Sequence, residues 1–313
     1  MSAAPLHPAC TRAPGSLMLM GEHAVLHGCN ALCAAIDQEI RVRLQPAADR
    51  RVRIDSALGT WEGRLDQLQP AEPFQFVLAA LGCAGLTQGL HLEIEADFAA
   101  TIGFGSSAAV TVATVAALQA ARGLPLDRAA VFSEARAILH QVQGRGSGAD
   151  LAAATYGGVV RYRAEPLEIE PLRCALPLAA HYCGYKTPTA EVIARLDAHW
   201  AGRERGRDAI FAEIDGLTRE GVAALRAGDL PRLGGLFDTH ARCQEALGCA
   251  DDTLNHLLRC LRAHPAVLGA KISGSGLGDC VISLAETLPE VPDFTGYALQ
   301  VDLQGVQRLE AGD

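Results

Sequence analysis

Three glycine-rich segments carry the residue types that phosphate chemistry needs. The first spans residues 103–109, Gly-Phe-Gly-Ser-Ser-Ala-Ala, and precedes a long Ala-rich stretch. A glycine-rich turn that opens a helix leaves backbone N–H groups unpaired around one spot, which favours phosphate binding, and a Ser hydroxyl there can reach a metal ion. The chain lacks the GxxxxGK[ST] pattern, so this is not a Walker A loop. The alternative is a tight strand-to-helix turn that binds nothing.

The second segment spans residues 143–150, Gln-Gly-Arg-Gly-Ser-Gly-Ala-Asp, and ends in a single carboxylate. Asp150 is the strongest candidate for a general base. Beside Arg145 it would stay ionised and could orient or deprotonate a hydroxyl group. A helix N-cap is the commoner use of an Asp after Gly, and the two roles are compatible.

The third segment, residues 271–280, places glycines at alternate positions before an apolar run over 281–284. We expect it to form a loop that braces the other side of a substrate or nucleotide, although glycines also serve hairpins and bulges. A further pair, Glu22 and His23, lies in a small-residue turn after a strand over residues 14–20. Without an HExxH pattern this pair does not indicate a metalloprotease.

The elements that position these residues follow from hydrophobic periodicity. Alternation predicts strands over residues 40–44 and 90–95, and an apolar run predicts a helix over 74–81. The stretch 107–122 has no Gly or Pro and is apolar all round, which predicts a buried helix. Further expected elements are a strand over 157–162 and helices over 126–143, 189–200, 208–227, 230–247 and 251–263. Prolines at 166, 171 and 177 predict a domain junction, which divides the chain into residues 1–165 and 166–313.

Composition excludes several classes of protein. The chain has 313 residues, of which 49% are hydrophobic and 20% charged, so it can bury a core without disulfides. Its net charge of −9 argues against a nucleic-acid partner, and no apolar run approaches the length of a membrane span. The 10 cysteines are scattered without a CxxC pattern, so we expect reduced thiols and a cytoplasmic protein. Only two lysines are present, Lys186 and Lys271, each beside a turn.

Taken in order, the four segments resemble the motifs of the GHMP kinase superfamily, and the match spans nearly the whole chain. The family's first motif resembles residues 13–28, its phosphate loop residues 103–109 and its third motif residues 271–280. Within the superfamily, residues 21–28 look most like the mevalonate kinases. The resemblance implies an α+β, two-domain fold, an N-terminal sheet-and-helix domain and a C-terminal α/β domain, with the active site in the cleft between them. It also implies ATP and Mg²⁺ as cofactors and phosphoryl transfer to the hydroxyl of mevalonate, a step of isoprenoid precursor biosynthesis.

The resemblance also assigns roles to individual residues. It implies Asp150 as the catalytic aspartate and Ser107 as the metal-binding serine, with Ser106 as the alternative. We expect Lys186 and Arg145 to be the cations that assist Asp150. The implied ATP-binding residues are Gly103, Gly105, Ser106, Ser107 and Ala108. The implied substrate-binding residues are Glu22, His23, Ser147, Gly148, Lys271, Ser273, Gly274 and Ser275.

Two departures from the family pattern leave questions open. Ser16 stands where the first motif commonly carries Lys, so that cation must come from elsewhere or be missing, and the possible substitutes are Lys186, Lys271, Arg12 and Arg145. Leu139 stands where mevalonate kinases carry a metal-binding Glu, so a second metal ligand has to come from elsewhere, with Glu134 or Asp150 as candidates. Residues 278–280 look more like phosphomevalonate kinases, which makes that activity the alternative. A related decarboxylase and a non-catalytic binding protein are weaker alternatives. A homodimer also stays open.

Overall fold

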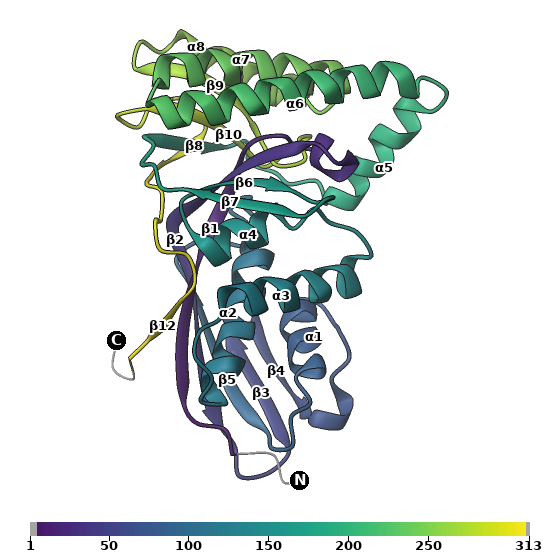
Figure 1. The fold of residues 1–313 in the computed structure, drawn as a ribbon, viewed down its shortest axis with the longest axis vertical. Helices are drawn as coiled ribbons and strands as arrows, with labels where there is room; N and C mark the ends of the chain where they lie inside the picture. Colours follow the sequence, from purple (N-terminus) through teal and green to yellow (C-terminus); the bar gives the residue numbers. More distant parts are fainter. Residues whose placement is uncertain (1–4, 311–313) are drawn as a thin grey trace.

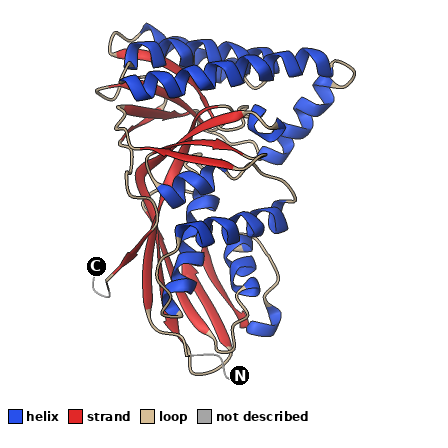
Figure 2. Ribbon diagram, in the orientation of Figure 1, coloured by secondary structure: helices blue, strands red, loops and turns tan. Residues whose placement is uncertain are grey.

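The computed structural model describes residues 5–310, which form two sheets with helices packed on them (Figures 1 and 2). The first sheet has eight strands. Six follow the order β12-β1-β2-β5-β3-β4, β6 also pairs with β2, and β7 pairs with β6. All its pairs are antiparallel except β3 with β5. The strands are β1 (Ala9–Met20), β2 (Asn30–Pro46), β3 (Arg51–Ser56), β4 (Gly59–Arg64), β5 (Leu90–Ala96), β6 (Val159–Arg163), β7 (Glu168–Leu172) and β12 (Gln307–Leu309).

The second sheet has four antiparallel strands in the order β11-β8-β10-β9. They are β8 (Leu178–Tyr182), β9 (Val267–Ser273), β10 (Cys280–Ala285) and β11 (Thr295–Leu299). Helices α7 (Leu230–Leu247) and α8 (Asp252–Ala263) pack on β9, and α6 (Glu204–Ala227) packs on α7. A short helix, α5 (Thr189–Trp200), leads into α6 at one end of this layer (Figure 1).

Helices α1 to α4 cover one face of the first sheet, and the two that touch its strands are rich in alanine. Helix α2 (Ser106–Ala121) and helix α4 (Ala149–Tyr156) lie on β1 and β2, while α1 (Gln75–Cys83) and α3 (Arg128–Gln143) pack against α2. Thirteen residues of α2 are buried, which agrees with its Ala-rich, uniformly apolar sequence. Because α2 and α4 share the same strands, their N-termini can place loops 103–105 and 144–148 near one another.

Most of the expected elements are present within a few residues of their predicted bounds. The helices expected over 107–122 and 230–247 are observed as α2 and α7, and the alternating segments 40–44 and 90–95 lie inside β2 and β5. Asp251 caps α8 by accepting a hydrogen bond from the Leu254 N–H at 3.0 Å. The loop expected over 271–280 is shorter, because its first three residues belong to β9.

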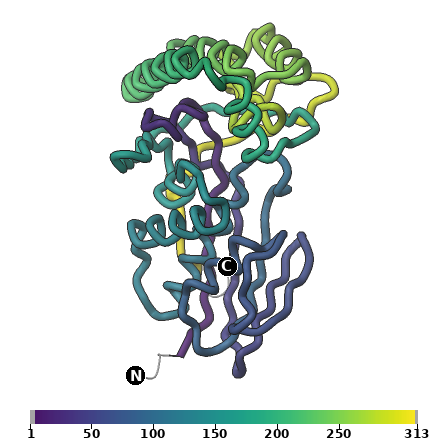
Figure 3. Tube along the Cα trace, turned by 90° about the vertical axis from the view of Figure 1, so that its right-hand side faces the viewer, coloured from purple at the N-terminus to yellow at the C-terminus, as the bar shows by residue number. Residues whose placement is uncertain are grey.

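The chain returns to the first sheet at its C-terminal end. Strand β12 pairs with β1, and the Arg12 guanidinium donates to the Asp302 carboxylate at 2.8 Å (Figures 1 and 3, yellow beside purple). Strand β7, beyond the expected junction at residue 165, pairs with β6 of the first sheet. One hydrophobic core also runs through both sheets. We therefore propose that the sheets divide at residues 173–177, with residues 300–310 belonging to the first.

No helix in the described part of the chain is both long and apolar enough to cross a membrane.

Candidate active site

The glycine-rich loop opens helix α2 in the way that phosphate binding needs. Gly105 is the N-cap residue, with a left-handed backbone at φ 66°, and no side chain caps the helix. The N–H groups of the first turn therefore keep their hydrogen-bonding capacity for an anion. The Ser106 hydroxyl donates to the Ala100 carbonyl at 3.4 Å, whereas the Ser107 hydroxyl makes no hydrogen bond within residues 5–310. Ser107 is thus the freer of the two predicted hydroxyl ligands.

Asp150 lies in the first turn of α4, close to this loop. Helix α4 also starts after a left-handed glycine, Gly148, and the Tyr162 hydroxyl supports the preceding loop by donating to the Ser147 carbonyl. One oxygen of Asp150, Oδ1, accepts a hydrogen bond from the Ser16 hydroxyl at 2.8 Å. Asp150 is therefore not a conventional N-cap, because Gly148 occupies that position. Strand β1, the glycine-rich loop and Asp150 therefore meet at Ser16, whose backbone N–H also donates to the Phe104 carbonyl.

The second sheet contributes an acidic loop and a lysine to the same region. Asp279 lies against the phosphate loop, since a Cβ added at Gly103 would be 3.1 Å from its side chain. Lys186 Nζ is 3.4 Å from Asp279 Oδ1 and forms an ion pair with it, while 37% of the lysine side chain stays exposed. Burial raises the pKa of Asp279, the Lys186 charge opposes this, and the nearby charge of Asp150 raises it further. The predicted assisting lysine is therefore close to the site but pairs with Asp279.

Lys271 was predicted to bind substrate, but the structure places it elsewhere. Its side chain is fully buried in a charged cluster. Its ammonium donates to Glu22 Oε1 and to the Ile272 carbonyl, and Glu22 itself is 3% exposed. Desolvation raises the pKa of Glu22 and lowers that of Lys271, in each case against the attraction of the opposite charge. The prediction that Lys271 binds substrate is corrected accordingly: a side chain with no exposed surface supports the fold and cannot reach a ligand.

His240 on α7 completes this cluster as a neutral group. The Gly21 N–H donates to His240 Nε2 at 3.0 Å, so that nitrogen carries no proton. Burial, followed by the nearby Lys271 charge, lowers the pKa of His240 well below its usual value. Its 3.4 Å approach to Glu22 Oε2 is consequently not an ion pair. The cluster joins the turn after β1, in the first sheet, to β9 and α7 of the second.

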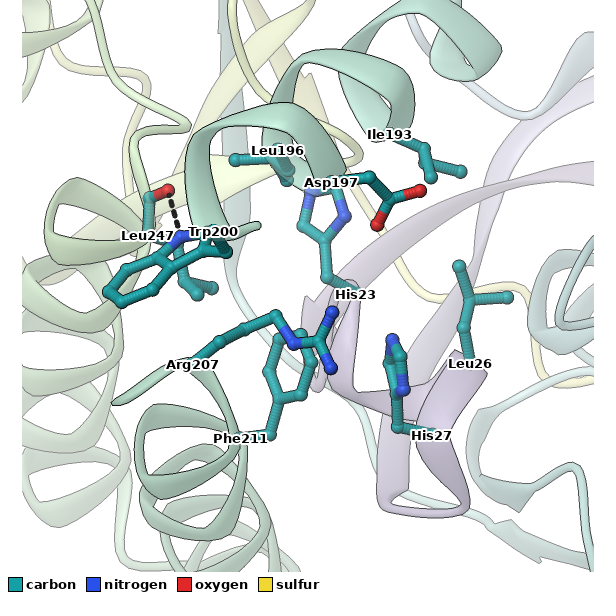
Figure 4. Close-up of a pocket in the computed structure, with 10 residues that line it drawn as sticks. All are labelled: His23, Leu26, His27, Ile193, Leu196, Asp197, Trp200, Arg207, Phe211 and Leu247. Atoms are coloured by element: carbon teal, nitrogen blue, oxygen red, sulfur yellow. Dashed lines mark hydrogen bonds between the residues drawn. The ribbon is translucent and has the colours of Figure 1, made fainter. Parts of the chain in front are cut away.

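His23 occupies the turn that follows β1 and faces a small pocket. Its Nε2 lies 2.8 Å from the Ser275 carbonyl and therefore donates to it, which leaves Nδ1 as an acceptor. Burial lowers the pKa of His23, in keeping with a neutral ring. Figure 4 shows His23 beside Asp197 and across from Arg207 in this pocket, which measures about 20 Å³. That volume is room for one water-sized group, so the pocket holds no whole substrate.

The other predicted residues divide between the site and its surroundings. Arg145 does not contact Asp150; its guanidinium lies 3.7 Å from the Asp197 carboxylate of α5, and 51% of its side chain is exposed. Ser273 ends β9 and is 3% exposed, while Gly274 packs near Asp279. The predicted residues at 103 and 105 lie in the loop before α2, those at 147 and 148 lie in the loop before α4, and Ala108 lies in the first turn of α2.

Glu134, one candidate for the second metal ligand, lies away from the phosphate loop. It interacts with Arg122, which caps the C-terminal end of α2, whereas the phosphate loop is at the N-terminal end. A helix of that length separates its two ends by about 24 Å. The carboxylates near the loop are those of Asp150 and Asp279.

Two residues that contact Asp150 were not identified from the sequence as part of the site. Ser16 was noted as a departure from the family pattern, without a role. Cys33, on β2, is fully buried and donates its thiol to Asp150 Oδ1 at 3.5 Å. The continuous apolar run over residues 31–36 could have shown that Cys33 is buried, but not that it faces a residue 117 positions away.

Comparisons with known proteins agree with this geometry. Three family models match: GHMP kinases N terminal domain over residues 73–158, GHMP kinases C terminal over 222–294, and a galactokinase galactose-binding signature over 3–46. The chain is 30% identical over 282 residues to a mevalonate kinase of Aeropyrum pernix, covering 87% of each chain. It is 32% identical over 273 residues to a mevalonate kinase of Archaeoglobus fulgidus, covering 87% of this chain and 90% of the relative.

The fold is shared with solved structures as well. The structure of L. major mevalonate kinase in complex with R-mevalonate superposes with a TM-score of 0.77 at 23% identity, covering 96% of this chain and 98% of that one. At that identity the similarity establishes the fold, and it confirms the predicted two-domain architecture. The sequence relatives carry the family assignment. The chain belongs to the GHMP kinase family.

Proposed function

We propose that the chain is an ATP- and Mg²⁺-dependent kinase that transfers the γ-phosphoryl group of ATP to the hydroxyl of mevalonate. The observation that carries this proposal is the meeting of an uncapped helix N-terminus, at Gly105, with the carboxylate of Asp150. Phosphoryl transfer depends chiefly on positioning and on neutralising charge. An anion cradle beside a single base suits that reaction, and the relatives named mevalonate kinase indicate the acceptor.

Each group has a distinct task in this mechanism. The N–H groups at the start of α2 bind phosphate oxygens, and Asp150 accepts the proton of the attacking hydroxyl. Lys186, which is partly exposed and paired with Asp279, is the nearest lysine and replaces the cation that the family carries at position 16.

The residues also fit a magnesium ion. Mg²⁺ prefers oxygen ligands and binds through one or two carboxylates together with substrate phosphates. The free Ser107 hydroxyl and the carboxylate of Asp279, which also pairs with Lys186 through its Oδ1, would hold it here. When bound, the ion neutralises charge on the transferred phosphoryl group.

The acceptor would lie between Asp150 and the turn that carries His23. Arg145, on the loop before Asp150, is exposed and could pair with an acceptor's carboxylate in place of Asp197. The unprotonated Nδ1 of His23 could accept a hydrogen bond from a hydroxyl. Asp279 and Cys280, which resemble the third motif of phosphomevalonate kinases, favour 5-phosphomevalonate as the second candidate acceptor.

ADP release from purified protein with ATP and Mg²⁺ tests the proposal. Mevalonate, 5-phosphomevalonate and galactose are offered separately, with Asp150→Ala as the blank and Asp252→Ala, a carboxylate change at an exposed position in the first turn of α8, as the matched control. We expect turnover on mevalonate, a loss of several orders of magnitude in Asp150→Ala, and nearly unchanged ATP affinity, because Asp150 acts in the chemical step. Turnover on one of the other acceptors alone would replace mevalonate. ATP binding without turnover on any of them would contradict the kinase assignment.

A further inference from the structure

Ser16 connects the phosphate loop to the catalytic aspartate. Its backbone N–H donates to the Phe104 carbonyl at 3.0 Å, and its hydroxyl donates to Asp150 Oδ1 at 2.8 Å. The loop closes tightly over it, since a Cβ added at Gly105 would lie 2.0 Å from Ser16 Oγ. Ser16 is 1% exposed, so no ligand competes for its hydroxyl. One buried side chain therefore fixes the distance between the anion cradle and the base.

Cys33 reaches the same carboxylate oxygen from the neighbouring strand. Strands β1 and β2 pair antiparallel, with Met18 opposite Cys33, which places the thiol beside Ser16. The Cys33 thiol is fully buried and donates to Asp150 Oδ1 at 3.5 Å. Burial and the charge of Asp150 both raise the pKa of this thiol well above its usual value. The thiol consequently stays protonated and remains a donor.

We propose that Ser16 and Cys33 are a pair of positioning residues that hold Asp150 by its Oδ1 and leave Oδ2 to accept the acceptor's proton. Within residues 5–310, no hydrogen bond to Asp150 Oδ2 competes with that role. Both donors are neutral, so they orient the carboxylate without placing a positive charge beside it, as a lysine at position 16 would. The role assigned to Oδ2 rests on the proposed kinase function.

Kinetics of four variants test the inference. Cys33→Ala and Ser16→Ala each remove one donor, the double variant removes both, and Cys33→Ser restores a donor at the same place. Cys243→Ala, which removes another buried thiol from α7, is the matched control. We expect each single loss to lower kcat about tenfold and the double loss to lower it further, because misplacing a catalytic group by about 1 Å costs about a hundredfold. KM for ATP should stay constant, and Cys33→Ser should recover most of kcat.

Packing alone predicts a different result. If Ser16 and Cys33 only fill space, Cys33→Ala and Ser16→Ala will lower the melting temperature as Cys243→Ala does while kcat stays near the wild-type value. That outcome would overturn the proposal. Cys33→Ser gives a second check. If this variant melts at the wild-type temperature but does not recover kcat, the positioning role of Cys33 is wrong.

An infrared measurement separates this inference from the proposed function. The S–H stretching band of Cys33 is isolated as the difference between wild type and Cys33→Ser, and hydrogen bonding to a carboxylate shifts it to lower frequency. We expect Asp150→Ala to move the band back. If the band is shifted but the protein has no kinase turnover, the Cys33–Asp150 hydrogen bond is supported and the proposed kinase function is wrong. If the protein is an active kinase but Asp150→Ala leaves the band where it is, the positioning role of Cys33 is wrong and the kinase function stands.

Discussion

Replacing Lys271 with methionine tests the buried cluster that joins the two sheets. The change removes the ammonium group and keeps an unbranched side chain of similar length, so it removes the positive charge and leaves most of the packing contacts in place. Glu22 is 3% exposed and loses the cation that contacts its Oε1. Its remaining Oε2 already lacks a hydrogen bond, because the facing nitrogen of His240 carries no proton. Leaving one partner of a buried ion pair alone typically costs about 3–5 kcal/mol.

The second lysine of the chain provides the matched control. Lys186→Met makes the same chemical change in an ion pair whose lysine side chain is 37% exposed and whose Asp279 side chain is 8% exposed, so water screens this pair more than the fully buried pair and its loss costs less. For a protein of this size, each kcal/mol lowers the melting temperature by roughly 2–4 °C. We therefore expect Lys271→Met to melt about 10 °C below the wild type and Lys186→Met to melt within a few degrees of it.

The pH dependence of stability gives an independent check. In Lys271→Met, burial raises the pKa of Glu22 further above its ordinary value of 4.5, because the opposing cation is gone. A carboxyl whose pKa is higher in the folded state binds its proton more tightly there. Its contribution to stability is thus complete below pH 4.5 and is lost as pH rises toward the folded-state pKa. The deficit of Lys271→Met relative to the wild type should be larger at pH 8 than at pH 5.

Thermal and urea unfolding, followed by circular dichroism, measure these effects. The double variant Glu22→Gln, Lys271→Met leaves no buried charge in the pair and should recover much of the lost stability. Equal melting temperatures for Lys271→Met and Lys186→Met would refute the reasoning, since the buried pair would then carry no more energy than the exposed one. A double variant as unstable as the sum of the singles would refute the pairing of Glu22 with Lys271.

Two further predictions concern the phosphate end of the site. Ser107→Ala should raise the Mg²⁺ concentration needed for half-maximal activity, whereas Ser106→Ala should leave it unchanged because that hydroxyl donates to the Ala100 carbonyl; the reverse order in a Mg²⁺ titration would move the metal role to Ser106. Lys186→Ala should lower kcat/KM more than Lys186→Arg, which keeps the charge beside Asp279. Equal, small effects of both changes would assign Lys186 to the solvated surface.

Sequence alone predicted the elements whose signals are local. Helix α2 is defined by its Ala-rich composition and by Gly123 at its end, so its bounds were predicted to within one residue. The turn before α2 and the loop before α4 were predicted from their glycines. The signal is again local, because the backbone conformation of a glycine turn depends on few neighbours. Strand β12, by contrast, has three residues and no alternation, and it exists only because β1 pairs with it.

Residues defined by distant partners were missed or misassigned. Lys271 was expected beside a substrate because it precedes a glycine-rich loop, but its partner Glu22 lies 249 residues away and both are buried. Cys33 was expected only as one of ten scattered, reduced thiols, because its contact with Asp150 depends on how α4 packs on β2. A hydrophobic pattern reports which face of an element is buried and gives no information about which polar group meets it there.

The two departures from the family pattern have a common consequence for how the site is assembled. Ser16 replaces a lysine with a neutral donor, and Leu139 replaces a carboxylate with a side chain that packs against the loop at Gly146. Relative to that pattern, β1 lacks a cation at Ser16 and α3 lacks a carboxylate at Leu139. The ion pair that lies beside the glycine-rich loop, Lys186 with Asp279, comes from the second sheet. The charge balance of the site consequently depends on the relative position of the two sheets. The buried cluster around Lys271 is one of the contacts that hold the sheets in that position.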